Sequence, residues 1–284
     1  MRTVRLANAL GAEVRGLDLS RPLGEAQHSE LRQLWLEHLV LVFRNQSLTP
    51  QQLIDFSRRF GELESHDNYQ SELRHPDHPE LLVVRTTRLN GRRVAFGQQW
   101  HSDLSYTLRP SMGSCLYCLK VPAVGGDTLF SNTIMAYEAL TPMMRSVVEQ
   151  LEAIHDITNG RTFREASAEQ VEAARRRNPP VIQPIVRTHR ETGRKALFVS
   201  EWMCNRIAGM TAEEGRDLVR FLCSHSVREE FTFRQRWRPG DVLMWDNRAT
   251  VHMALADYPD DAERELLRTS IKGNPEGRPL AATA

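Results

Sequence analysis

The sequence predicts an α+β protein in which helices pack outside antiparallel β-sheets. Strand and helix signals mix along the chain without the regular alternation of a parallel α/β sheet. Most predicted strands are short and end at turn residues such as Arg238-Pro239-Gly240-Asp241, which favours an antiparallel sandwich or barrel. Hydrophobic residues make up 40% and charged residues 26% of the 284 positions, as in ordinary folded domains.

The N-terminal part contains two helix signals and one strong strand signal. Apolar residues recur at helical spacing from Glu25 to Leu39, and the apolar run LVLVF (39–43) follows as a short buried strand. Thr49-Pro50-Gln51-Gln52 has the pattern of a capping box with proline at the first helical position. Gly61 is expected to end that second helix.

Further helices are indicated by residues that cap helix N-termini. A second capping box, Thr211-Ala212-Glu213-Glu214, predicts a helix through about His225, and Asn132 and Thr141 are expected to cap two shorter helices. The remaining strands are predicted at Leu81 to Val84, Ser114 to Val121, Asp127 to Phe130, Ile182 to Val186, Ala196 to Val199, Phe231 to Trp237, Val242 to Trp245 and Leu266 to Ile271.

The domain organisation predicted from these elements is a single domain over residues 1–284. We find no interdomain linker, and two segments, around 64–98 and 159–180, are predicted to be loop or lid insertions. The second of these is polar and includes Arg175-Arg176-Arg177-Asn178-Pro179-Pro180.

The balance of charges favours a small-molecule partner. Lys and Arg number 37 against 36 Asp and Glu, so the formal net charge is +1, far from the basic excess of a surface that binds nucleic acid or an anionic membrane. No secretory signal is found, and no uncharged apolar run approaches the roughly 20 residues of a membrane span. We therefore expect a soluble, cytoplasmic protein.

Four cysteines are too few and too scattered for a disulfide framework in a chain of this length. Cys115 and Cys118 form a Cys-x-x-Cys motif within SCLYCLKV, but positions three apart in a strand point to opposite faces. We expect them to be reduced thiols that act as buried small hydrophobic residues.

One His-x-Asp motif is a candidate for metal binding. In an extended segment, His101 and Asp103 leave the same face and can reach one ion. A second such motif, His75-Pro76-Asp77, lies among prolines and has the features of a surface turn. Because spacing alone is weak evidence, the first motif also remains compatible with a site that binds no metal.

His252, just beyond a predicted strand, is the candidate third ligand. Two histidines and one carboxylate on one face of an octahedral ion are typical of non-haem Fe(II) oxygenases. Zn(II) accepts the same ligands. A histidine at this position is also compatible with a structural role in the core.

Several motifs then match a known family in order and spacing. They are WHSD at 100–103, GGDT at 125–128, WDN at 245–247, His252, and Arg264 and Arg268 in RELLRTSIKG. The chain resembles the taurine dioxygenase family (TauD/TfdA) of Fe(II)- and 2-oxoglutarate-dependent oxygenases, which includes the chlorophenoxyacetate dioxygenases. The resemblance extends from GAEVRGLDLSRPL through LVFRNQSLT and FSRRFGEL to the last strand.

The resemblance implies a double-stranded β-helix (jelly-roll) core with flanking helices. It also implies that His101, Asp103 and His252 hold Fe(II), that 2-oxoglutarate is the cosubstrate and that O2 is the oxidant. Arg264 would bind the distal carboxylate of 2-oxoglutarate, assisted by the hydroxyl of Thr128. Judged from its charged neighbours alone, Arg264 would more often be a surface residue paired with Glu263 or Glu265.

The resemblance also implies an anionic primary substrate. Arg268 lies on the same face of an extended strand as Arg264, and it would bind the anionic end of the substrate with help from His66 and Tyr69. Leu104 and Met203 would line the substrate pocket. A solvated loop at 66–69 and simple core packing of Met203 are the alternatives. Gly97 and Met203 depart from the residues expected in taurine dioxygenase, which puts taurine in doubt as the substrate.

The implied reaction hydroxylates a sulfonate, a sulfate ester or an aryloxyalkanoate-like substrate and yields succinate and CO2. Two other functions remain open: a zinc-dependent hydrolase using the same ligands, and a non-catalytic metal-binding barrel. Neither alternative explains Thr128 or Arg264. Similar enzymes are often dimers or tetramers, so a homo-oligomer is expected.

Overall fold

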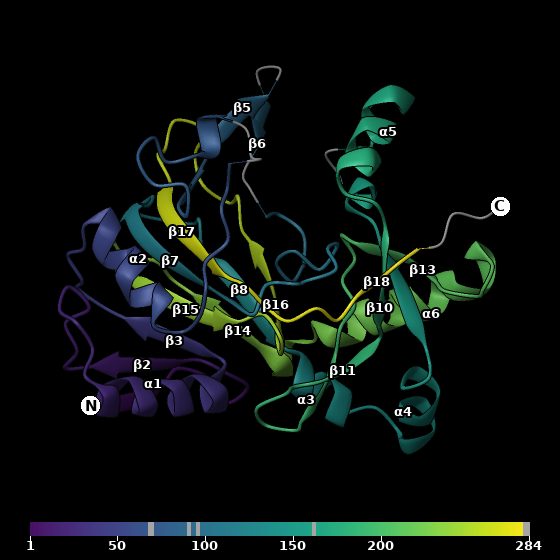
Figure 1. Ribbon diagram of the computed structural model, residues 1–284, viewed down its shortest axis with the longest axis horizontal. Coiled ribbons are helices and arrows are strands. Elements are labelled where there is room, and N and C mark those ends of the chain that lie inside the picture. Colours follow the sequence, from purple (N-terminus) through teal and green to yellow (C-terminus); the bar gives the residue numbers. More distant parts are fainter. Residues whose placement is uncertain (68–70, 90–91, 95–96, 161–162, 281–284) are drawn as a thin grey trace.

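The computed structural model describes residues 1–67, 71–89, 92–94, 97–160 and 163–280 (Figure 1). Its largest sheet contains seven strands, which are antiparallel except where β2 runs parallel to β3. The order of these strands is β1 (Arg2–Arg5), β2 (Ala12–Arg15), β3 (Val40–Phe43), β15 (Val242–Asp246), β7 (Gly113–Lys120), β17 (Glu265–Ile271) and β4 (Leu82–Arg85).

Four smaller sheets, all antiparallel, accompany the large sheet. The one that carries a candidate ligand has the order β14 (Thr232–Gln235), β8 (Thr128–Asn132) and β16 (Thr250–Ala254). A four-stranded sheet has the order β13 (Cys204–Ile207), β9 (Glu152–His155), β10 (Val181–Pro184) and β18 (Arg278–Pro279). The two-stranded sheets pair β11 (Val186–Thr188) with β12 (Lys195–Leu197), and β5 (Thr87–Leu89) with β6 (Arg92–Val94).

Helices flank the sheets, as the sequence predicts. Figure 1 shows α1 (Glu25–His38) and α2 (Pro50–Arg58) beside the large sheet, and α5 (Ala168–Arg177) and α6 (Ala212–Ser226) at the other end of the molecule. The shorter helices are α3 (Thr133–Glu138), α4 (Pro142–Val148) and the 3-10 turns η1 (Ser71–Leu73), η2 (Ile157–Asn159) and η4 (Glu229–Phe231). Thr49, Asn132, Thr141 and Thr211 all cap helices through their side chains, which confirms the four predicted starts.

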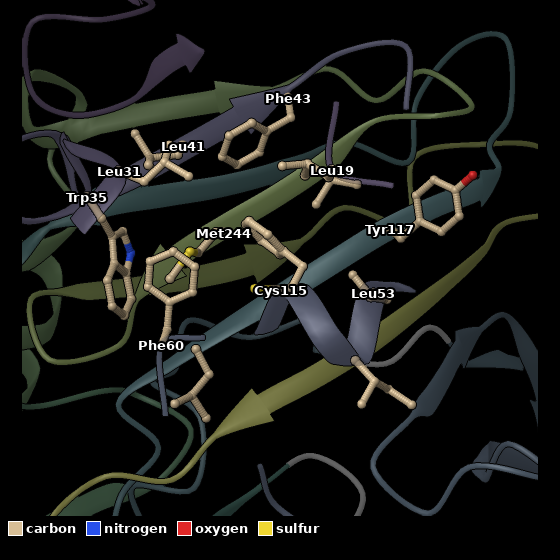
Figure 2. Packing of buried hydrophobic residues seen from close by; sticks show 14 of the residues in the cluster. Leu19, Leu31, Trp35, Leu41, Phe43, Leu53, Phe60, Cys115, Tyr117 and Met244 are labelled. Carbon is tan, nitrogen blue, oxygen red and sulfur yellow. The ribbon is translucent and has the colours of Figure 1, made fainter. Parts of the chain in front are cut away.

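Two hydrophobic clusters pack against the large sheet. In the first, Trp35 of α1 and Leu53 of α2 pack with Leu41, Cys115 and Met244 from the sheet (Figure 2). In the second, Phe130 of β8 packs with Leu243 and Trp245 of β15, so the three-stranded sheet and the large sheet share one core. Burying these apolar side chains removes them from water and is the main stabilising contribution to the layered arrangement.

The two cysteines of the Cys-x-x-Cys motif lie on opposite faces of β7. Cys115 belongs to the first cluster and Cys118 to the second, and both are free thiols. Burial raises the pKa of each thiol to about 12, so both are neutral at physiological pH. The prediction that they act as small hydrophobic residues is therefore confirmed.

The two segments predicted as insertions contain regular structure. Residues 64–98 include β4, which pairs with β17 in the large sheet. Residues 159–180 include α5, whose N-terminus has a capping box formed by Ser167 and Gln170.

Among the described residues, no helix is both long and apolar enough to cross a membrane.

Candidate functional site

The three candidate ligands meet between β16 and the segment before β7. An isolated antiparallel bridge pairs His101 with His252, with N–H···O distances of 3.0 and 2.8 Å in the two directions. Asp103 follows two residues later, and its Oδ1 lies 3.8 Å from His101 Nε2 and 4.0 Å from His252 Nε2. One ligand atom from each residue lies within 4.8 Å of the others, and all three side chains are buried.

The imidazoles are held in orientations suited to a metal. His101 Nδ1 lies 2.7 Å from the carbonyl oxygen of Gln99, and we assign the ring proton to this nitrogen, which leaves the Nε2 lone pair facing Asp103. The His252 ring packs against both Phe130 and Trp245, with centroid distances of 5.7 and 4.8 Å. Burial lowers the pKa of both histidines, that of His252 to about 3, so both rings are neutral as metal coordination requires.

The Asp103 carboxylate is fixed through both oxygens. Ser114 Oγ donates to Oδ2 at 2.7 Å, and Asn247 Nδ2 lies 3.4 Å from the same oxygen. Arg268 Nη1 donates to Oδ1 at 3.0 Å. Burial alone would raise the pKa of Asp103, but the Arg268 guanidinium, with the two imidazoles and Ser114, holds it below its usual range. Asp103 is therefore an anionic ligand at neutral pH.

The donor set fits Fe(II). Two neutral imidazoles and one carboxylate converge from one side, in the pattern that leaves further coordination positions open. Beside them is a cavity of about 30 Å3 whose walls include Thr128, Arg264 and Arg268. The cosubstrate and substrate arginines expected from the sequence therefore line the same cavity as His101 and His252.

Arg264 is buried in this cavity, with 5% of its surface exposed. Its Nε donates to the carbonyl oxygen of Gly126 at 2.9 Å, and it makes no ion pair with any described residue. Glu263 instead pairs with Lys120 at 2.9 Å. The alternative of a surface ion pair for Arg264 is therefore wrong. Burial without a carboxylate partner lowers the pKa of this guanidinium from its usual value.

The other predicted substrate residues lie in different surroundings. His66 is 2% exposed, and burial lowers its pKa to about 3, with a further lowering by the charge of Arg268. Leu104 has a left-handed backbone with φ of 55° and lines a separate cavity of about 580 Å3. Met203 is buried among the apolar residues of a third core cluster. Tyr69 lies outside the described residues.

Sequence reasoning missed the groups that position the ligands. Gln99 acts through its backbone carbonyl, which any residue type would provide, and Ser114 is one serine in an apolar strand. Asn247 belongs to the WDN motif, but nothing in that motif indicates its partner. Trp202, whose ring packs edge-on to His101 at a centroid distance of 4.6 Å, is a further neighbour of the site.

Comparison with known proteins decides the family. A family model described as "Taurine catabolism dioxygenase TauD, TfdA family" matches residues 2–270. The chain belongs to this family. It is 37% identical over 272 residues to the alpha-ketoglutarate-dependent 2,4-dichlorophenoxyacetate dioxygenase of Cupriavidus pinatubonensis, covering 91% of this chain and 93% of that protein.

Two solved structures agree with this assignment. A taurine dioxygenase from Burkholderia xenovorans superposes with a TM-score of 0.84 at 31% identity, covering 99% of this chain and 95% of the other. AAD-2 in complex with Mn(II) and N-oxalylglycine superposes with a TM-score of 0.83 at 29% identity, covering 99% and 100%. N-oxalylglycine differs from 2-oxoglutarate by an NH in place of one CH2.

The protein is therefore an oxidoreductase, a 2-oxoglutarate-dependent dioxygenase of the TauD family with Fe(II) at a His-Asp-His site. Its substrate is a small organic molecule. The zinc hydrolase and the non-catalytic metal-binding barrel are set aside by this membership.

Proposed function

We propose that this dioxygenase hydroxylates a small organic monoanion, such as a sulfonate, a sulfate ester or an aryloxyalkanoate. The observation that carries the proposal is that two buried guanidiniums, Arg264 and Arg268, line the same small cavity as His101 and His252. The dichlorophenoxyacetate named for the Cupriavidus relative is such an anion.

Counting charges in the cavity favours a substrate with one negative charge. With neutral imidazoles, the protein contributes one negative charge from Asp103 and two positive charges from Arg264 and Arg268. Fe(II) adds two positive charges, and 2-oxoglutarate adds two negative ones. One positive charge then remains, and an unpaired buried charge is costly. A monoanionic substrate head neutralises it, whereas a neutral substrate does not.

Arg264 and Thr128 are proposed to bind the distal carboxylate of 2-oxoglutarate. Because Arg264 is anchored through Nε to Gly126, its two Nη groups stay available for a bidentate contact with a carboxylate. Trp237 Nε1 donates to Thr128 Oγ1 at 2.9 Å, which leaves the Thr128 hydroxyl hydrogen free to donate to the same carboxylate.

Arg268 is proposed to bind the anionic head of the substrate, with His66 beside it, and Tyr69, Leu104 and Met203 are proposed to contact the rest of the molecule. Iron and 2-oxoglutarate, when bound, supply the oxidation of a substrate C–H bond, with release of succinate and CO2. The residues around them orient that bond and keep water from the site. The half-buried ring of Trp202 against His101 contributes to this exclusion.

We also propose that the chain is one domain whose seven-stranded and three-stranded sheets form the double-stranded β-helix of the family. The shared core between β8 and β15 supports this arrangement. The active protein is proposed to be a homo-oligomer, as similar enzymes often are.

The test is substrate-dependent succinate formation over a panel of sulfonates, sulfate esters and aryloxyalkanoates, each compared with an uncharged analogue such as 2-phenoxyethanol. We expect turnover with at least one anion and none with its uncharged analogue. The Arg268→Gln variant is expected to lose about 30-fold or more in kcat/KM, because removing one partner of a buried charge pair costs about 2–5 kcal/mol. Arg236→Gln, which changes an exposed arginine outside this cavity and outside the one that Leu104 lines, is the matched control. Equal turnover of charged and uncharged analogues would contradict the proposal.

A further inference from the structure

A second groove lies behind the metal site. It has a volume of about 590 Å3 and runs between α6 and the segment 199–206. Trp100 and Val251, the chain neighbours of the bridged pair His101 and His252, both line it. Because successive side chains of an extended segment point to opposite faces, the groove and the metal cavity lie on opposite sides of this bridge. No described residue lines both.

The walls of this groove are rich in arginine. Its lining contains four arginines and one acidic residue, Glu201, although the net charge of the whole chain is only +1. The arginines are Arg164, Arg206, Arg216 and Arg220. Arg220 lies 3.2 Å from Asp217, but the other three make no ion pair with any described residue. Guanidiniums gathered at a concave surface create a positive potential that attracts anions.

The floor of the groove is apolar. The indole of Trp100 is half-buried, and Val199, Val219 and Val251 lie in the same wall. An inorganic ion would use only the arginines, whereas a ligand with an apolar body would also bury the surface of Trp100 and the valines.

We propose that this groove is a second anion-binding site, distinct from the metal cavity, for a small organic oxyanion. The phosphate, sulfonate or carboxylate head binds Arg206 and Arg216, since a guanidinium matches the oxygens of these groups with two parallel hydrogen bonds. The aromatic or aliphatic body lies against Trp100. The site adds a binding function to the proposed oxygenase activity and does not depend on it.

Phenyl phosphate is a suitable probe, with inorganic phosphate and phenol as its two halves. Calorimetric titration is performed on protein loaded with Mn(II) and N-oxalylglycine, so that Arg264 in the metal cavity is engaged, and is repeated with Arg268→Gln to detect binding at the second arginine of that cavity. We expect saturable binding of phenyl phosphate at one site per chain, weaker binding of inorganic phosphate and none of phenol. The tryptophan fluorescence is expected to change on binding in the wild type and much less in Trp100→Phe.

Variants of the groove arginines test where phenyl phosphate binds. Arg206→Gln with Arg216→Gln is expected to weaken phenyl phosphate binding by about 100-fold, because each lost charge-assisted hydrogen bond is worth about tenfold. Arg216→Gln alone changes an exposed side chain, so it provides a folded variant with a smaller effect in the same direction. Arg236→Gln, an exposed arginine outside the groove, is expected to stay within about twofold of the wild type.

Three results would overturn the proposal. The first is the absence of saturable phenyl phosphate binding. The second is loss of binding in Arg268→Gln but not in the double groove variant, which would place the anion in the metal cavity. The third is a change of oligomeric state in the double variant, measured by sedimentation, with no effect on anion binding, which would make the groove a contact between copies of the chain.

Discussion

Replacing Ser114 by alanine tests how the protein holds its carboxylate ligand. Ser114 is fully buried in β7, and its hydroxyl donates to Asp103 Oδ2 at 2.7 Å. The remaining contact to that oxygen, from Asn247 Nδ2, is 3.4 Å long. A hydrogen bond to a charged group contributes about 1.5–3 kcal/mol, so we expect Ser114→Ala to lower the free energy of unfolding by about that amount.

The same change is expected to weaken metal binding. Groups that orient metal ligands typically contribute about 10- to 100-fold to metal affinity. We therefore expect the dissociation constant for Mn(II), measured by electron paramagnetic resonance, to rise by about 10- to 100-fold in Ser114→Ala. Urea unfolding of the metal-free protein measures the change in the free energy of unfolding separately.

The strand next to β7 provides a matched control. Ser270 of β17 pairs directly with Ser114, is equally buried, and its hydroxyl has no hydrogen-bond partner among the described residues. Ser270→Ala removes the same atom from the same layer of the sheet, but we expect no loss of metal affinity and no loss of stability. Equal Mn(II) affinities in the two variants would refute the claim that Ser114 positions Asp103.

Three further predictions concern the cosubstrate and the core. Arg264→Lys is expected to raise the KM for 2-oxoglutarate about tenfold or more, because lysine lacks the bidentate geometry, while the affinity for Mn(II) stays unchanged. An unaltered KM in the succinate assay would count against Arg264 as the residue that binds the distal carboxylate. Arg248→Met removes a guanidinium bonded 2.7 Å from the buried Asp246 carboxylate, and we expect urea unfolding to show a loss of about 3–5 kcal/mol; a loss below about 1 kcal/mol would mean that the pair is not important for stability. Gly113→Ala places a Cβ 2.5 Å from Trp35 Cζ2, and thermal unfolding is expected to show a loss of at least about 1–3 kcal/mol, whereas wild-type stability would argue against this packing.

The helices were predicted well wherever their signals are local. The capping boxes at Thr49 and Thr211 satisfy backbone donors within one turn of the same chain, so four residues are enough to place each helix start. The helix at 168–177 carries an equally local signal, Ser167 with Gln170, but its arginine-rich and polar composition favoured a loop. Strands β1 and β2 were missed because they are only four residues long and partly polar, and their order depends on pairing with other segments.

Local sequence patterns predict only part of the candidate site. The spacing of His101 and Asp103 indicates a shared face, but their meeting with His252 depends on a bridge between segments about 150 residues apart. The sequence around His252 left a structural role in the core equally open, and it was the resemblance to a family that favoured the metal site. Likewise, the charged run around Arg264 favours a surface position. Its burial follows from the place of β17 between β7 and β4, which the sequence around Arg264 does not specify.

The dioxygenase activity depends most directly on a single ferrous site that binds 2-oxoglutarate next to Asp103. Anaerobic addition of Fe(II) and then 2-oxoglutarate, followed by visible absorption spectroscopy, measures this site before any turnover. We predict a charge-transfer band that requires both components and is lost in Asp103→Ala. A wild-type protein without the band, or an Asp103→Ala variant that retains it at full intensity, would contradict the account.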